Sequence, residues 1–397
     1  MSLFLLTFFL LYSCLHLYTF FKIRGGLSFG PLTAVALTAF MAVMVSAPVL
    51  VRVSERHGFD VAARLLSYIG YTWMGLVFIF FCLSVAIDLY RLFLYTGGLI
   101  IQRDLSYIIP TPRVTLIMAT MVTLTIASLG YFEARNIRND TVVIKTPKLP
   151  EEIGTLTIAQ ISDVHLGLIV REDRLRRIVK KVNEAQPDIL VSTGDLVDGQ
   201  IDNLAGLAEI LKTVHPKHGK FAVTGNHEFY AGLDQALDFI QEAGFRVLRG
   251  EALTVAGIVN IVGIDYPTGR HVGMGRDVGE TELLQRLPRD KFTILLKHQP
   301  VVDDSALGLF DLQLSGHTHK GQIFPFSLIT RLFFPRHAGL FALSDNHFLY
   351  VNRGSGTWGP PIRFLAPPEV TVIKLIPGDK KAPRGKTAIP SSLEITD

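Results

Sequence analysis

Cysteine is scarce in this chain, and several nucleophile and phosphate-binding motifs are missing from its larger part. The 397 residues include two cysteines, Cys14 and Cys82, which both lie in apolar stretches near the N-terminus. The rest of the chain therefore has neither a disulfide framework nor a thiolate metal site. From residue 134 onward it also lacks a glycine-rich phosphate loop ending in Lys-Ser/Thr and a Gly-x-Ser-x-Gly nucleophile motif. The sequence therefore offers no recognised motif for a covalent nucleophile.

Charged residues are absent from four long apolar stretches before residue 133. Each stretch has about 20 residues, the length that crosses roughly 30 Å of hydrocarbon. The chain is 49% hydrophobic, and short charged loops separate the four stretches. We therefore predict four transmembrane helices, in the ranges Leu3–Phe21, Pro31–Val51, Ser67–Ile87 and Val114–Phe132. The first is predicted to be retained, since it has no basic region before it and no small-x-small cleavage site, and further spans follow it.

The predicted location is the cell membrane, in a multi-pass arrangement with the lipid bilayer as a partner. Anchoring is a simpler role for the four stretches than transport, because they contain no charged residue. An even number of spans places the N-terminus and the C-terminal domain on the same side. The positive-inside rule leans slightly towards a cytoplasmic C-terminal domain when Lys145 and Lys148 are counted.

The net charge of +4, without a dense basic patch, predicts no nucleic-acid partner. The oligomeric state stays open.

The pattern changes near residue 134, from long apolar stretches to short β-rich runs that alternate with amphipathic helices. We predict a transmembrane region at 1–133, a catalytic domain at 134–378 and a flexible tail at 379–397. Apolar runs such as Ile189–Ser192 and Phe292–Leu296 end shortly before polar residues, and strand ends are where α/β folds bind ligands. Later strand-like segments, including His347–Val351, suit a second sheet. The predicted fold is an α/β two-sheet sandwich flanked by helices, rather than one doubly wound sheet.

Five short polar blocks follow the predicted strands. They are Asp163-Val164-His165, Gly194-Asp195-Leu196-Val197-Asp198, Gly225-Asn226-His227-Glu228, a lone His298, and Gly316-His317-Thr318-His319. Together they supply the oxygen and nitrogen ligands that a two-metal phosphoester-cleaving centre requires. Such mixed ligands suit Mn²⁺, Fe²⁺ or Zn²⁺ rather than Ca²⁺.

Each block has an ordinary alternative when it is taken alone. Asp195 has two carboxylate oxygens and is suited to bridge two metals, yet Gly-Asp-x-x-Asp is also a common helix cap. A lone histidine at a strand end, such as His298, more often has a structural role than a metal-binding one. His227 can protonate a leaving alkoxide near neutral pH. Asp198 can accept a hydrogen bond from the other ring nitrogen of His227. The pair His317 and His319 can reach two adjacent metals.

The five blocks in this order resemble the signature of the calcineurin-like metallophosphoesterase superfamily, over about residues 140–376. The resemblance implies a sandwich of two mixed sheets with two divalent metal ions at the strand ends. By position it implies Asp163, His165, Asp195 and His319 at the first metal. At the second metal it implies Asp195, Asn226, His298 and His317. His227 would be the catalytic histidine, with Asp198 as its partner.

The stretch from Gly354 to Arg363 is similar to that of membrane-anchored members of this superfamily. These members usually carry a glycine where this chain has Lys320, which either binds substrate phosphate or points to solvent. The expected activity is hydrolysis of a phosphoester or phosphodiester by metal-activated hydroxide, with a lipid or nucleotide-lipid phosphate among the candidate substrates. The segment Ile323–Leu343 either presents such a lipid or packs as a flap on its own domain. The alternative function is a catalytically silent, membrane-bound metal-binding or sensing module.

Overall fold

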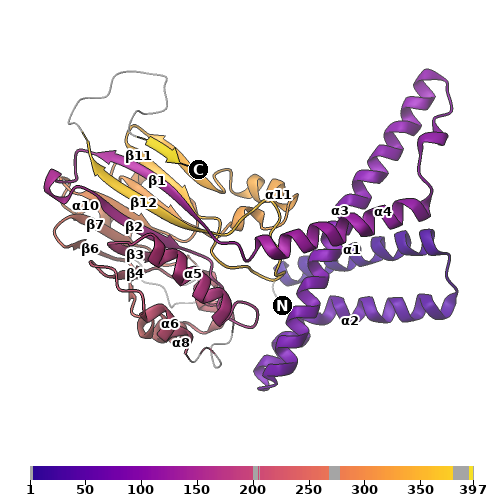
Figure 1. Cartoon of the computed structure of the whole chain (residues 1–397), viewed down its shortest axis with the longest axis horizontal. Coiled ribbons are helices and arrows are strands. Elements are labelled where there is room, and N and C mark those ends of the chain that lie inside the picture. The colour runs from indigo at the N-terminus through magenta and orange to yellow at the C-terminus, as the bar shows by residue number, and fades with distance from the viewer. Residues whose placement is uncertain (1–2, 200–203, 205, 268–277, 379–392, 397) are drawn as a thin grey trace. The chain divides into compact units, whose positions relative to one another are not determined.

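The computed structural model describes residues 3–199, 204, 206–267, 278–378 and 393–396. It divides into two compact units (Figure 1). One unit comprises Met1–Phe132 with Gly359–Phe364, and the other comprises Glu133–Trp358 with Leu365–Asp397.

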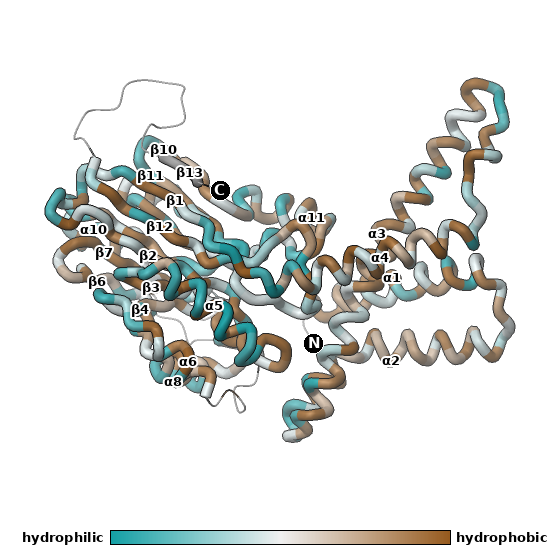
Figure 2. The backbone as a smooth tube through the Cα atoms, viewed as in Figure 1, coloured by the Kyte–Doolittle hydropathy of each residue, from teal (hydrophilic) through white to brown (hydrophobic). Residues whose placement is uncertain are grey.

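The first unit consists mainly of four helices that are long and apolar enough to cross a membrane. They are α1 (Leu3–Leu27), α2 (Pro31–Arg56), α3 (Asp60–Ile101) and α4 (Pro112–Glu133), with a short helix η1 (Ser106–Ile108). Figure 2 shows hydrophobic residues along much of all four. At 42 residues, α3 extends well beyond its apolar stretch.

A cluster of polar and charged side chains joins α1 to α3. Asp88 of α3 accepts hydrogen bonds from Lys22 Nζ at 2.5 Å and from Tyr18 at 2.6 Å. The segment Gly359–Phe364 packs on α4, where the Arg363 amide donates to the Gly130 carbonyl at 3.0 Å. A β-carbon at Gly130 would lie 2.6 Å from Ile362 Cγ2, so glycine is needed for this close approach.

The second unit contains two mixed sheets among its described residues. The first sheet has the order β13-β1-β12-β2-β3-β4-β5, and β2 to β5 run parallel. Its strands are β1 (Arg138–Thr146), β2 (Leu156–Ile161), β3 (Ile189–Ser192), β4 (Lys220–Ala222), β5 (Arg246–Val247), β12 (Glu369–Pro377) and β13 (Leu393–Thr396). Of the predicted tail, residues 379–392 and 397 lie outside the described residues, and Leu393–Thr396 pair with β1.

The second sheet has the order β10-β11-β9-β8-β7-β6, in which β7, β8, β9 and β11 run parallel. Its strands are β6 (Glu251–Val255), β7 (Val259–Gly263), β8 (Phe292–Leu296), β9 (Leu312–Ser315), β10 (Gly339–Ser344) and β11 (His347–Val351). The prediction of two mixed sheets is therefore confirmed.

Buried aliphatic side chains hold the layers together. Ile158 and Ile189 of the first sheet share one core with Ile261 and Ile294 of the second. The opposite face of the first sheet packs against the helices α5 and α8, and the second sheet packs Leu295 against α10. The helices of this unit are α5 (Glu172–Glu184), α6 (Leu207–Lys212), α7 (Asn226–Ala231), α8 (Leu233–Glu242), α10 (Glu280–Gln285) and α11 (Phe326–Phe333), with short turns η2 (Glu151–Ile153), η3 (Asp304–Ala306) and η4 (His319–Gly321).

Candidate metal centre

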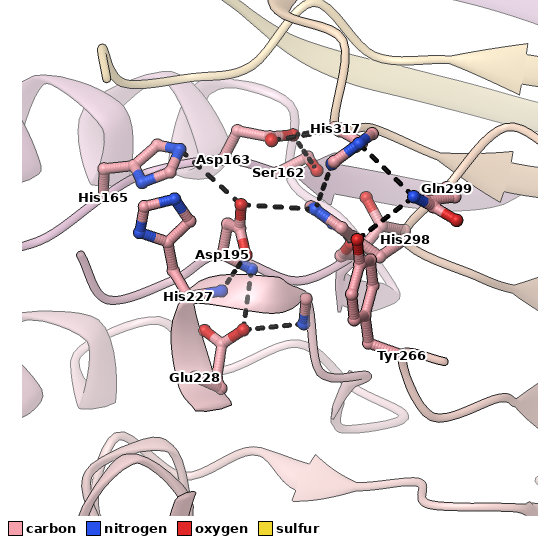
Figure 3. Close-up of polar contacts among 12 residues, drawn as sticks. Ser162, Asp163, His165, Asp195, His227, Glu228, Tyr266, His298, Gln299 and His317 are labelled. Atoms are coloured by element: carbon pink, nitrogen blue, oxygen red, sulfur yellow. Dashed lines mark hydrogen bonds and ion pairs between the residues drawn. The ribbon is translucent and has the colours of Figure 1, made fainter. Parts of the chain in front are cut away.

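The polar blocks meet where the parallel strands of both sheets end. Asp163, Asp195 and Asn226 follow the neighbouring strands β2, β3 and β4. His298 and His317 follow the neighbouring strands β8 and β9. Because parallel strands end at the same edge of a sheet and the two sheets share one core, the five blocks converge. Figure 3 shows side chains from all five blocks gathered in one place.

The first group of potential ligands comprises Asp163, His165 and His319, all of them buried. His319 Nε2 lies 3.3 Å from Asp163 Oδ1 and 3.1 Å from His165 Nε2. One atom from each of the three residues lies within 4.8 Å of the others. The group therefore combines one carboxylate oxygen with two imidazole nitrogens.

The second group comprises Asp195, His298 and His317. His298 Nε2 lies 3.2 Å from Asp195 Oδ2 and 3.2 Å from His317 Nδ1. His298 Nδ1 donates to the Thr193 carbonyl at 2.7 Å, and Nε2 is directed at Asp195. Burial lowers the pKa of His298, but the charge of Asp195 raises it further, to about 9. A second ring nitrogen bound to a backbone carbonyl is the usual arrangement for a metal-binding histidine.

Asn226 fits the same centre. Its side-chain oxygen is buried and has no hydrogen-bond partner within the described residues. A buried amide oxygen without a partner costs free energy, and coordination of a cation would offset that cost. The convergent carboxylates, imidazoles and this oxygen form a donor set suited to Mn²⁺, Fe²⁺ or Zn²⁺.

His227 and Asp198 form a pair beside these groups. His227 Nδ1 lies 2.9 Å from the Asp198 carbonyl oxygen and 3.0 Å from its carboxylate Oδ1. Both neighbours are acceptors, so Nδ1 carries a proton. The same Oδ1 lies 3.4 Å from His165 Nδ1, so Asp198 contacts two histidines of the centre. His227 also belongs to a third group of potential ligands, with His165 and Asp195.

Charge and burial together set the protonation of the centre. Burial raises the pKa of Asp163 and of Asp195, but the nearby histidines outweigh this and hold both values below the usual range. Burial and the neighbouring His298 lower the pKa of His317 to about 4, which leaves its ring neutral. Burial lowers the pKa of His227, whereas Asp195 and Asp198 raise it further, to about 10. Ionised carboxylates and a neutral imidazole are the forms that bind cations.

Sequence comparison relates this chain to known proteins. Residues 156–321 match the model of the calcineurin-like phosphoesterase family. An uncharacterized metallophosphoesterase of Aquifex aeolicus is 42% identical over 252 residues, which cover 63% of this chain and 96% of that protein. The chain belongs to the calcineurin-like phosphoesterase family. It is therefore a metal-dependent phosphoester hydrolase.

Two further comparisons concern the membrane region and the fold. The transmembrane protein with metallophosphoesterase domain from Danio rerio is 34% identical over 65% of this chain, which spans 62% of that relative's length. This likeness and the four apolar helices place the chain in the membrane-anchored branch of the family. The crystal structure of a 5'-nucleotidase precursor from Thermus thermophilus aligns with a TM-score of 0.35 at 18% identity, over 56% of this chain and 54% of that one.

Glu228 is a buried residue of this phosphoesterase site to which the sequence analysis gave no role. Its carboxylate accepts the backbone N–H groups of Gly225 at 2.6 Å, Asp195 at 3.0 Å and Leu196 at 2.8 Å. Asp195 Oδ1 in turn accepts the His227 amide at 2.9 Å. Glu228 therefore ties two of the blocks together. Glu228 lies in the first turn of α7, three residues after Gly225, which is the capping-box position. This spacing is the sequence pattern that could have identified the structural role of Glu228.

The backbone of the centre is strained. Five of the seven predicted ligands have φ between 49° and 72°, in the left-handed region that non-glycine residues rarely adopt: Asp163, His165, Asp195, His317 and His319. Each such residue costs on the order of 1–2 kcal/mol. Strain of this kind gathers at functional sites, where the surrounding structure holds it in place.

Trp358 and Lys320 lie next to the predicted ligands. The Trp358 ring contacts His227 edge-on, with centroids 5.8 Å apart, and is 52% exposed. Gln322 fixes it by accepting the Trp358 amide at 2.9 Å and donating to the Trp358 carbonyl at 2.9 Å. Lys320 is half-buried, which lowers its pKa, and it has no ion pair within the described part of the chain.

Proposed function

We propose that this chain hydrolyses a phosphoester or phosphodiester bond at a centre of two divalent cations, with Mn²⁺, Fe²⁺ or Zn²⁺ as the candidates. Asp163, His165 and His319 would hold one cation, and Asn226, His298 and His317 the other. Asp195 would bind both. The convergence of two ligand groups on either side of Asp195 is the observation that carries this proposal. When bound, such cations polarise phosphoryl oxygens and lower the pKa of water.

The role proposed for His227 is to give a proton to the departing alkoxide. Its Nδ1 is committed to Asp198, so Nε2 is the ring atom that can reach a leaving group. Asp198 would orient this ring and, through the same carboxylate, the ring of His165. Glu228 would act only by positioning Asp195 and the first turn of α7.

The proposed substrate is a lipid-linked phosphate at the membrane surface. Four aromatic rings border the centre and support an apolar substrate: Tyr230 and Trp358 beside His227, and Tyr266 and Phe334 beside His317. The four apolar helices are long enough to cross a bilayer, where such substrates are found, and this supports the proposal. We also propose a catalytic domain at residues 134–378 on the cytoplasmic side, between a transmembrane region at 1–133 and a tail at 379–397.

The test is hydrolysis of a chromogenic phosphodiester by the purified full-length chain loaded with Mn²⁺. We expect His227→Ala to lower kcat by about 10²–10⁴-fold, the contribution typical of general acid catalysis. Its metal content should equal that of the wild-type protein. The matched control is His215→Ala, at an exposed histidine outside the centre, which should retain full activity. Undiminished activity in His227→Ala would contradict the assignment.

The substrate class is tested with the same preparation in lipid vesicles. We expect faster hydrolysis of a lipid phosphoester than of a water-soluble diester with the same scissile bond. Equal rates for the two would remove the support for a lipid substrate. Bound metal without turnover on monoesters, diesters, nucleotides or lipid phosphates would instead favour the silent metal-binding module.

A further inference from the structure

The helix α11 exposes large apolar side chains. Leu332 is 81% exposed and Phe333 is 76% exposed. They belong to a set that we name the α11 surface, made up of Phe324, Phe326, Leu328, Ile329, Leu332 and Phe333, all at least 42% exposed. Contiguous apolar surface of this kind is uncommon on soluble domains and marks a place of interaction.

The apolar face of α11 points outward, whereas a helix on the surface of a soluble domain usually turns its apolar face towards the core. Leu328 and Leu332 stand four residues apart, as do Ile329 and Phe333, so they form one stripe that faces outward. Thr330 faces inward, is buried, and donates its hydroxyl to the Phe326 carbonyl at 3.2 Å. The apolar side chains of α11 therefore do not pack as a flap on their own domain.

Cations without ion-pair partners accompany this surface. Arg331 and Arg336 are exposed and Lys320 is half-buried, and no carboxylate pairs with any of them in the described ranges. Burial lowers the pKa of His337, and the positive charges of Arg331 and Lys320 lower it further. Positive charge beside outward-facing apolar residues matches the phosphates and acyl chains of a lipid surface.

The α11 surface is joined closely to the metal centre. At Gly321, in the turn that contains His319, a β-carbon would lie 2.5 Å from Ser327 N and Cα of α11. Phe334, directly after α11, packs its ring against His317 with centroids 5.3 Å apart. The helix is thus held against the same loop that carries two predicted ligands.

We propose that the α11 surface lies in the headgroup–acyl boundary of the bilayer that anchors the chain, with Arg331, Arg336 and Lys320 at lipid phosphates. A bilayer is the favoured occupant because the four apolar helices already bring it to the domain and because the cations complement its phosphates. The contact would hold the metal centre at the lipid surface. It deepens the proposed function by naming the partner, but the contact itself does not require hydrolysis.

The test is fluorescence quenching of a single label in the full-length chain, reconstituted in phosphatidylcholine vesicles. Cys14→Ser and Cys82→Ser remove the native thiols, and Leu332→Cys then carries an environment-sensitive fluorophore. The matched control is Asp238→Cys, at an exposed position of α8. We expect nitroxide attached to lipid to quench the label at position 332 strongly and the label at position 238 little.

Any other pattern of quenching at these two positions would contradict the contact with lipid. Equal quenching at the two positions, or none at position 332, would overturn it. If position 332 were shielded from both lipid nitroxide and aqueous iodide, a second copy of the chain or another protein surface would cover it, and the proposal would also fail. Since quenching does not depend on turnover, an inactive but quenched protein would overturn the proposed function alone.

A second measurement tests the role of the cations. We expect phosphatidylglycerol added to the vesicles to increase quenching at position 332. The combined changes Arg331→Ala and Arg336→Ala should abolish this increase. An increase of the same size in the variant would overturn the assignment of these arginines to lipid phosphates. The exposed pair Arg176→Ala and Arg177→Ala on α5 is the control, and it should leave the increase intact.

Discussion

Asp195 connects the two halves of the centre. Its carboxylate Oδ2 lies 3.8 Å from His165 Nε2 of the first group and 3.2 Å from His298 Nε2 of the second, and Oδ1 accepts the His227 amide. Its backbone is in the left-handed region, and its own amide is bound by Glu228. A strained residue stays in place only when several contacts hold it, so the buried Glu228 matters for the stability of the whole centre.

We predict that Glu228→Ala destabilises the domain. The buried N–H groups of Gly225, Asp195 and Leu196 would lose their acceptor, and each unsatisfied group costs about 1–3 kcal/mol. For a domain of this size, 1 kcal/mol lowers the Tm by roughly 2–4 °C. Thermal unfolding of the purified chain measures the change. The exposed Glu172→Ala is the control, and an equal Tm for the two variants would refute the role given to Glu228.

Motif spacing predicted which side chains form the centre, but it did not predict the hydrogen bonds and backbone conformations that fix them in position. The five blocks and their order were visible in sequence, including Asp163-x-His165 and His317-x-His319. The contact of Glu228 with Asp195 joins residues far apart in the chain, and no local pattern encodes it. The positive φ values and the Gln322–Trp358 bonds likewise depend on tertiary packing. The ligand roles themselves stay predictions until metal binding is measured.

At the scale of elements, the parallel arrangement of strands explains why separate blocks converge. The ends of β3 and β8 agree with the apolar runs Ile189–Ser192 and Phe292–Leu296. Such runs are visible in sequence because strands buried on both faces are continuously hydrophobic. The pairing of β13 with β1 and the length of α3 were not predicted. Pairing depends on residues distant in the chain, and α3 continues beyond its apolar stretch through Asp88, Arg91 and the Gly97-Gly98 pair, which a local pattern would place at a helix end.

We predict that Gly225→Ala disrupts the contact between the turns after β3 and β4. A β-carbon at Gly225 would overlap Asp195 Oδ1 and would lie 2.7 Å from Asp195 N. The carboxylate would have to move, so both metal content and phosphodiesterase activity should fall. Gly279→Ala is the matched control, because among the described residues its β-carbon would meet only Glu282, at 3.8 Å. Equal metal content and activity in the two variants would contradict this account.

At the scale of the whole molecule, a catalytic unit of two sheets is joined to four helices able to cross a bilayer. The four helices contain the apolar stretches seen in sequence, because a run of about 20 uncharged apolar residues is a strong signal. Under the proposed function, membrane anchoring would favour substrates at the lipid surface. The α11 surface, on the catalytic unit itself, would bring the metal centre to that surface.

The central claim is a two-cation centre that shares Asp195, and elemental analysis of the purified full-length chain tests it most directly. We predict two divalent ions per chain in the wild-type protein. We predict one in His317→Ala, which removes a ligand of the second ion, and fewer than one in Asp195→Asn, which weakens both sites. The same metal content in all three proteins would contradict the account.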